Sequence, residues 1–244
     1  MPRKAQKESV ADAHAAPGGA AAVDRALSLL SAFRPGDAAL TLAELAVRAQ
    51  LYKSTVLRLL ASLEHARLVQ KLDGGRYALG SEIARLHGIY AASFSLDRVV
   101  LPVLKNLVAR TGESAAYHVL QGEARLCLYR VDSPHPVRDH IKAGDILPGD
   151  RGTGARVLHA FNPDLAARAD PQGQVLLEAI RKAGYYASTG DRLTEVAGIS
   201  APVFRGGRTI AAALTLTMPA HRFDQRHVQP VLEAASRLSA AIPE

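Results

Sequence analysis

Apolar residues recur every three or four positions in three successive segments near the N-terminus, a spacing that predicts amphipathic helices. The first segment begins at Val23 and is stopped by the pair Pro35 and Gly36. The second opens at Thr41 with Glu44 three residues later, a spacing typical of a capping box at a helix N-terminus. We therefore expect two short helices before residue 50.

The third segment predicts a longer helix over residues 52–65, and its buried face is formed by Val56, Leu59, Leu60 and Leu63. Only residues 49–51 separate this helix from the one before it. Two helices joined by so short a turn form the outline of a helix-turn-helix.

A β-hairpin is expected directly after these helices. Two short alternating runs, 68–72 and 76–79, flank the sequence Asp73-Gly74-Gly75, and an Asp-Gly pair between such runs is a strong hairpin signal. Three helices followed by a hairpin predict a winged helix, and the combination is more specific than any one of its parts.

The rest of the chain changes character after two further helices. Ser81 is placed to cap the first of them, over 82–92, and the second runs from 97 to 111. Beyond these, strand-like runs lie at 115–120, 125–131, 199–204 and 209–218, and helical runs at 155–161, 172–182 and 224–241. This pattern predicts an α+β domain built on a mainly antiparallel sheet.

The length of 244 residues suits two domains. We expect a flexible tail over 1–21, a winged helix-turn-helix domain over 22–80, a linker helix over 81–95 and the α+β domain over 96–244. The tail is assigned because its Ala, Gly and charged residues show no apolar period.

Composition narrows the class of protein. Hydrophobic residues make up 48% and charged residues 22%, as in ordinary soluble globular proteins. No run approaches the ~18 apolar residues of a membrane span, and the N-terminus lacks the apolar core of a signal peptide, so we expect a cytoplasmic protein without a membrane partner. The single cysteine, Cys127, leaves no internal disulfide and reads as a small buried hydrophobe. The net charge of +7 suits a polyanionic partner but is a weak signal alone.

Polar and basic residues gather at the start of the predicted helix 52–65, away from its leucines. A helix in the major groove presents its first turns to base edges, and nearby hydroxyl and basic groups hold phosphates. An ordinary solvated helix face would carry similar residues, but the capped helix, the short turn and the hairpin favour DNA recognition. The predicted DNA-binding residues are Lys53, Ser54, Thr55, Leu57 and Arg58 on the helix and Arg76 in the wing.

The segments VDRALSLLSAF, LTLAELA, KSTVLRLLASLE and GRYALG, in this order and spacing, resemble the DNA-binding half of the IclR family of bacterial transcription regulators. The resemblance covers nearly the whole chain from about Ala22 and is strongest at 23–80 and 198–219. It implies a linker helix that pairs protomers, and a GAF-like C-terminal effector domain in a homodimer or a homotetramer built as a dimer of dimers. It also implies sequence-specific binding of double-stranded operator DNA under the control of a small-molecule effector.

A ligand site is expected in the C-terminal domain. A Gly-Thr-Gly turn lies directly ahead of the predicted helix 155–161, whose free N–H groups suit a carboxylate, although Thr153 acting only as a helix cap is the alternative. Thr215 and Thr217 share one strand face, and the family resemblance adds Asp191, Gly198 and Ser200. The predicted effector-binding residues are Leu147, Gly152, Thr153, Asp191, Val196, Gly198, Ser200, Thr215 and Thr217, with Ile199 as a further apolar wall. The expected effector is a small organic acid, aliphatic or aromatic.

Two other interpretations stay open. An enzyme would need a catalytic constellation, but the chain has no His-Glu-x-x-His, Gly-x-Ser-x-Gly, P-loop or paired-cysteine motif, and we expect no catalytic residue, metal or cofactor. His135 and His140 lie in a Pro-rich loop, where solvated histidines are the expected case. The other alternative is an oligomeric DNA-binding module whose C-terminal domain binds no effector, and ligand-dependent thermal stabilisation distinguishes it from a sensor.

Overall fold

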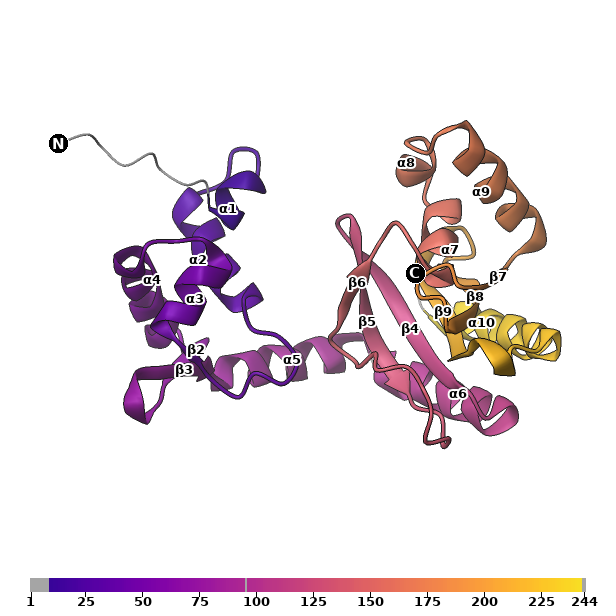
Figure 1. The fold of residues 1–244 in the computed structure, drawn as a ribbon, viewed down its shortest axis with the longest axis horizontal. Coiled ribbons are helices and arrows are strands. Elements are labelled where there is room, and N and C mark those ends of the chain that lie inside the picture. Colours follow the sequence, from indigo (N-terminus) through magenta and orange to yellow (C-terminus); the bar gives the residue numbers. More distant parts are fainter. Residues whose placement is uncertain (1–8, 95, 243–244) are drawn as a thin grey trace. The chain divides into compact units, whose positions relative to one another are not determined.

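A computed structural model describes residues 9–94 and 96–242 of the chain (Figure 1). The chain divides into two compact units, Met1–Ser93 and Phe94–Glu244, each with a hydrophobic core of its own. No helix within the described residues is long and apolar enough to cross a membrane.

The first unit is a winged helix, as the sequence predicts. Its elements are α1 (Val10–Ala13), α2 (Ala21–Ser31), β1 (Leu40–Thr41), α3 (Leu42–Ala49), α4 (Lys53–His65), β2 (Val69–Lys71), β3 (Arg76–Leu79) and α5 (Ser81–Phe94), with a 3₁₀ turn at Asp73–Gly75. The strands pair antiparallel in the order β1-β3-β2, so the predicted hairpin gains a short third strand. The core that holds α2, α3 and α4 together is formed around Leu29, Leu45, Val56 and Leu60.

The turn between α3 and α4 follows from local signals. Glu44 N donates to Thr41 Oγ1 at 3.2 Å, and Thr41 N donates to the Glu44 carboxylate at 2.7 Å, which confirms the capping box. At the other end of α3, Gln50 adopts a left-handed conformation with φ of 55°. Such a residue ends a helix by redirecting the chain, so α4 begins three residues later.

The segment before α2 differs from the expectation of a structureless tail. Ser9 and Asp12 form a capping box around α1, and Arg25 of α2 pairs with Asp12 at 2.8 Å. Ala11 is buried. The segment is ordered by polar caps and an ion pair, which leave no trace in the spacing of apolar residues. Residues 1–8 of the expected tail lie outside the described part of the chain.

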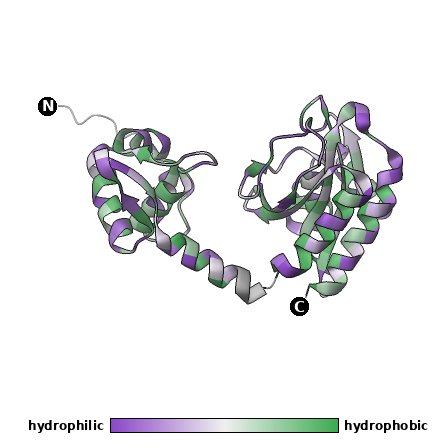
Figure 2. Cartoon of the chain, turned by 90° about the horizontal axis from the view of Figure 1, so that it is seen from below, coloured by the Kyte–Doolittle hydropathy of each residue, from purple (hydrophilic) through white to green (hydrophobic). Residues whose placement is uncertain are grey.

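Helix α5 carries both hydrophobic and hydrophilic residues along its length (Figure 2). The side chains of Leu86 and Ile89 are 45% and 50% exposed in the single chain. An apolar pair left in water on a helix is available for packing against another surface.

The second unit contains a six-stranded antiparallel sheet in the order β6-β5-β4-β9-β8-β7. The strands are β4 (Ser114–Gln121), β5 (Ala124–Val131), β6 (Ile146–Pro148), β7 (Tyr186–Thr189), β8 (Val196–Arg205) and β9 (Thr209–Pro219). The helices are α6 (Leu96–Thr111), α7 (Thr153–Phe161), α8 (Pro163–Ala166), α9 (Pro171–Ala183) and α10 (Val228–Ala241), with 3₁₀ turns at Ala220–Arg222 and Gln225–His227.

The two faces of this sheet are divided between different helices. Because side chains alternate along a strand, Leu214 and Leu216 of β9 pack against α6 and α10 in the main core. The alternate residue Ala213 packs with α7 and α9 in a second cluster on the other face. Thr215 and Thr217 follow Ala213 at intervals of two residues along β9, so their side chains point to the same face of the sheet, toward α7.

Candidate functional site

The N-terminal end of α4 presents the predicted DNA-binding residues to solvent. Lys53, Ser54, Leu57 and Arg58 are exposed, and Thr55 is half-buried. The opposite face of the helix is fixed in the core through Val56, Leu60 and Leu63. No described residue forms an ion pair or hydrogen bond with the Lys53 or Arg58 side chain, so both cations are available to an external anion.

Arg76 stands at the first position of β3 and not in the turn of the wing. Its Nη2 donates to the carbonyl of Ala39 at 2.8 Å and so ties the wing to the residue ahead of β1. The exposed tip itself is Asp73–Gly75, where Gly74 and Gly75 have φ of 76° and 72°. One N–H group of Arg76 is therefore used within the protein, and its other donors remain at an exposed position.

A small cavity in the second unit brings together most of the predicted effector-binding residues. It lies where the N-terminus of α7 meets β4, β8 and β9, and its volume is about 20 Å³. Among the predicted residues, its walls include Gly152, Thr153, Asp191, Val196, Gly198, Thr215 and Thr217. Its further walls are His118, Arg125, Ile141, Ser188, Arg192 and Ala197, which the sequence analysis did not single out.

Three buried hydroxyl groups join the sheet to α7. Ser200 Oγ lies 2.8 Å from Thr153 Oγ1 and 2.9 Å from Thr215 Oγ1, and His118 Nδ1 lies 3.2 Å from Thr215 Oγ1. Ser200 is fully buried and lies behind the cavity wall, so it positions the two threonines. Thr153 is not the helix cap that was the alternative, because it is the first residue of α7 and Gly152 occupies the N-cap position.

Asp191 is fastened to the start of α7. Its carboxylate accepts from Gly152 N at 2.9 Å and from Arg156 Nε and Nη2 at 3.3 and 3.1 Å. The Asp191 carboxylate raises the pKa of Arg156. Asp191 lines the cavity, but its negative charge is already engaged within the protein.

Two of the apolar residues predicted to line this cavity lie elsewhere. Leu147 of β6 lines an adjoining cavity of about 640 Å³, which shares Ile141, Arg192 and Val196 with the smaller one. Ile199 is fully buried in the main core with α6 and α10, because its parity along β8 is opposite to that of Gly198 and Ser200. The prediction that Ile199 lines the cavity was wrong, whereas Leu147 lines the adjoining cavity.

Two of the residues that sequence reasoning missed, Arg125 and His118, are titratable and deeply buried. Arg125 is 3% exposed, and burial lowers its pKa to about 10. His118 is 1% exposed, and burial, together with the positive charge of Arg125, lowers its pKa well below the usual range. The imidazole of His118 is therefore neutral at neutral pH.

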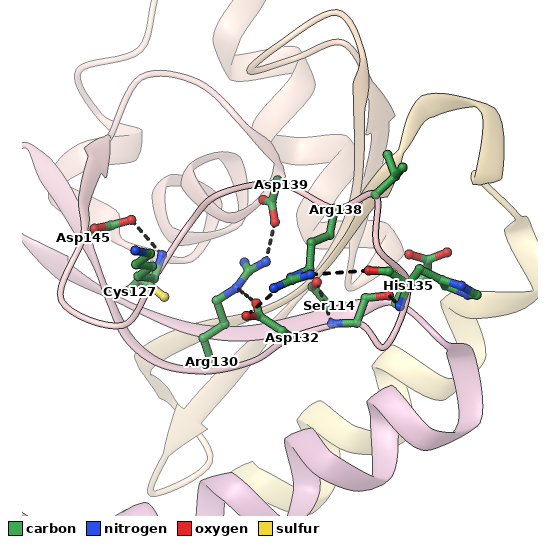
Figure 3. Close-up of polar contacts among 12 residues, drawn as sticks. Ser114, Cys127, Arg130, Asp132, His135, Arg138, Asp139 and Asp145 are labelled. Atoms are coloured by element: carbon green, nitrogen blue, oxygen red, sulfur yellow. Dashed lines mark hydrogen bonds and ion pairs between the residues drawn. The ribbon is translucent and has the colours of Figure 1, made fainter. Parts of the chain in front are cut away.

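The loop between β5 and β6 is held by a second set of charges. Asp139 points toward Arg130 and pairs with it, and Arg130 also donates to Asp132 at 2.7 Å (Figure 3). Arg192 donates to the other oxygen of Asp139 at 3.3 Å. Ser133 N donates to Ser114 Oγ at 2.9 Å, which fastens the start of the loop to β4. Within the described residues, no group of three His, Cys, Asp or Glu side chains is placed to hold a metal ion.

Two family models match parts of the chain. Residues 22–73 match the IclR helix-turn-helix domain, and residues 170–243 match the C-terminal domain of the bacterial transcriptional regulator IclR. The HTH-type transcriptional regulator BhcR of Paracoccus denitrificans is 30% identical over 250 residues, covering 91% of this chain and 87% of that protein. The chain belongs to the IclR family.

Further relatives agree with this assignment. The glycerol operon regulatory protein of Streptomyces coelicolor is 27% identical over 232 residues, or 88% of this chain and 91% of that protein. A crystal structure of a protein from Silicibacter sp. TM1040, assigned to the IclR transcriptional regulators, shares 26% identity and a TM-score of 0.78, covering 90% of this chain and 95% of that one. The IclR-family chain is thus a transcriptional regulator with a DNA-binding domain.

One solved relative holds a ligand. An IclR homologue from Microbacterium hydrocarbonoxydans, in complex with 4-hydroxybenzoate, has a TM-score of 0.77 and 23% identity, and covers 90% of this chain and 98% of that one. At this identity the likeness concerns the IclR-family fold. The α+β class, the winged helix and the antiparallel sheet predicted from the sequence are confirmed.

Proposed function

We propose that this regulator binds operator DNA through α4 and the wing, and that a small organic acid taken up by the C-terminal domain controls this binding. Residues 22–80 would recognise DNA, 81–95 would link protomers and 96–244 would bind the effector. Lys53 and Arg58 support the first part, because both are exposed on a helix anchored in the core and no residue that the structure describes pairs with either side chain. The polar cavity at the start of α7 supports the second.

Two protomers would present their α4 helices to successive major-groove half-sites, and such symmetry calls for a palindromic operator. The exposed Leu86 and Ile89 on α5 supply an apolar surface for pairing, in a dimer or in a tetramer of two dimers. An effector shifts DNA binding only as far as it binds one arrangement of the protomers better than the other.

The DNA contact is tested by replacing Arg58. In Arg58→Ala, operator affinity measured by fluorescence anisotropy should fall by roughly 1–3 kcal/mol if Arg58 reads a base, whereas a phosphate contact would weaken all duplexes alike. Arg208→Ala is the matched control, since Arg208 is an exposed cation in the turn between β8 and β9. Unchanged affinity of Arg58→Ala for every duplex would remove Arg58 from the interface.

Effector control is tested by mapping the protected DNA with and without candidate acids. Titration of the same acids in a thermal-shift assay reports binding to the protein independently of DNA. An acid that stabilises the protein and changes operator affinity supports the proposal. If acids change neither, the effector-free DNA-binding module is the better description.

A further inference from the structure

The outward face of α4 carries a leucine where most of the predicted DNA-binding residues are polar or basic. The Leu57 side chain is 51% exposed, and it is not among the described residues that pack in the core of the first unit. Exposed apolar side chains occur singly on most protein surfaces, so exposure alone does not indicate a function. The neighbours of Leu57 on the helix decide what it can contact.

Leu57 lies on the stripe of α4 that points directly away from the core. Residues spaced by three, four and seven positions share one face of a helix. The exposed residues with this spacing are Ser54, Leu57, Arg58 and Ala61. The buried residues Val56, Leu60 and Leu63 form the opposite face. The part of α4 that a DNA groove would receive is therefore apolar at its middle, with a hydroxyl and a guanidinium beside it.

The charge around Leu57 indicates which kind of surface covers it. Lys53 lies one helical turn before Leu57, and Arg58 follows it directly. No described residue forms an ion pair or hydrogen bond with either cationic side chain. An apolar protein surface on this face would remove water from both cations without replacing it, whereas DNA supplies phosphates to both. Charge complementarity therefore favours DNA as the partner of this stripe.

The major groove offers one kind of apolar group to such a side chain. Guanine, adenine and cytosine present nitrogen and oxygen atoms there, whereas thymine presents its C5 methyl group beside O4. A leucine against a polar base edge removes water from that edge and forms no hydrogen bond in return. Against a methyl group, the same leucine buries apolar area on both partners.

We propose that Leu57 makes this regulator select a 5-methylpyrimidine, which in ordinary DNA is thymine, at one base position of each operator half-site. This inference rests on the function proposed above and specifies a base that α4 recognises. Burial of one methyl group corresponds to about a fourfold change in affinity, so loss of the methyl group in both half-sites should weaken binding roughly 16-fold.

The test uses the full chain without added ligand and a duplex that this chain selects at low salt from a pool with a random core. Each thymine of that duplex is replaced in turn by deoxyuridine, which lacks only the C5 methyl group, and the dissociation constant is measured by fluorescence anisotropy. One replacement in each half-site should weaken binding about fourfold. With cytosine at the same position, 5-methylcytosine should bind about fourfold more tightly than cytosine, because it carries the same methyl group.

Three variants separate the methyl contact from other effects. Leu57→Ala should bind the thymine and uracil duplexes with nearly equal affinity, and Leu57→Met, which keeps a long apolar side chain, should keep the discrimination. Leu193→Ala is the matched control, because Leu193 is 50% exposed but belongs to the second unit, and it should discriminate as the wild type does. Circular dichroism should show unchanged folding in both Leu57 variants, since Leu57 lies outside the core.

An equal uracil penalty in the wild type and in Leu57→Ala, or the absence of any thymine whose methyl group matters, would overturn the assignment. Loss of self-association by Leu57→Ala in sedimentation, with an unchanged uracil scan, would overturn it in favour of a contact between copies. The proposed function fails separately. If the wild type retains no duplex at low salt, DNA binding itself fails, whereas duplexes retained without methyl dependence remove only the role of Leu57.

Discussion

Gly198 of β8 lies directly against Thr153, the first residue of α7, and adding one methyl group at Gly198 should disrupt the cavity wall. A Cβ on Gly198 would lie 2.5 Å from Thr153 Oγ1, 3.4 Å from its Cγ2 and 3.5 Å from its Cβ. Non-bonded heavy atoms attract best at about 3.5–4.0 Å, so the Oγ1 contact is too short by about 1 Å. Gly198→Ala therefore requires Thr153 or the backbone to move.

Thr153 is poorly placed to give way. It is 5% exposed, and its Oγ1 lies 2.8 Å from Ser200 Oγ, so a rotation that relieves the clash also breaks this hydrogen bond. Overpacking costs about 1–3 kcal/mol and a buried hydrogen bond contributes about 1 kcal/mol, so Gly198→Ala should destabilise the second unit by about 2–4 kcal/mol. Thr153→Ala removes the clashing atoms, and the double variant should be more stable than the sum of the single effects by at least ~1 kcal/mol.

The assay is native-state hydrogen exchange by mass spectrometry on the full chain, because it resolves β8, β9 and α7 from the first unit. Gly88→Ala is the control. Gly88 has ordinary helical geometry in α5 with nothing within 4 Å of an added Cβ, so this change should stabilise its helix by up to about 1 kcal/mol. Additive effects of Gly198→Ala and Thr153→Ala, or a neutral Gly198→Ala, would refute the packing argument.

Two further predictions concern the helix cap at Thr41 and the buried imidazole of His118. Thr41→Ala removes the capping box of α3 and should lower the stability of the first unit by about 1 kcal/mol in urea denaturation, with Ser62→Ala on the exposed face of α4 as the neutral control. His118 stays neutral in the folded protein because its pKa is lowered, whereas the unfolded chain gains a proton as the pH falls below 6.5. Since the unfolded state then binds more protons, stability should decrease on acidification by up to about 1.4 kcal/mol per pH unit, and His118→Gln should reduce this slope. An unchanged slope in His118→Gln would contradict the neutral imidazole.

The first unit was predictable because its signals are local. The Thr41 and Glu44 pair fixes the start of α3, and apolar spacing fixes the face of α4, so both elements appear where the sequence placed them. Very short strands that depend on distant partners were missed. Strands β6 and β7, three and four residues long, pair at the two edges of the sheet and have too few residues to show alternation.

Helix α10 shows how a local signal can be assigned to the wrong element. The sequence places its start at Asp224, but Asp224 accepts from Arg226 N at 2.8 Å and caps a separate 3₁₀ turn. The helix itself begins at Val228. A capping residue indicates that a turn of helix follows, and it does not determine how far that helix continues.

The sequence analysis did not single out Arg125, because the segment around it looks like an ordinary strand. It lies in the run RLCLYRV, which has the pattern of an ordinary strand. Its side chain points to the same face of the strand as that of Cys127, which lies two residues later and is fully buried. A cation on the buried face of a strand breaks the apolar pattern that stabilises a sheet. Such a break marks a residue that is present for a reason other than packing. Thr215 and Thr217, by contrast, obey the strand pattern and were found by it. The alternation of side chains along the strand therefore located the wall of the cavity, whereas the lack of a described hydrogen-bond partner for the buried Nε of Arg125 becomes visible only in three dimensions.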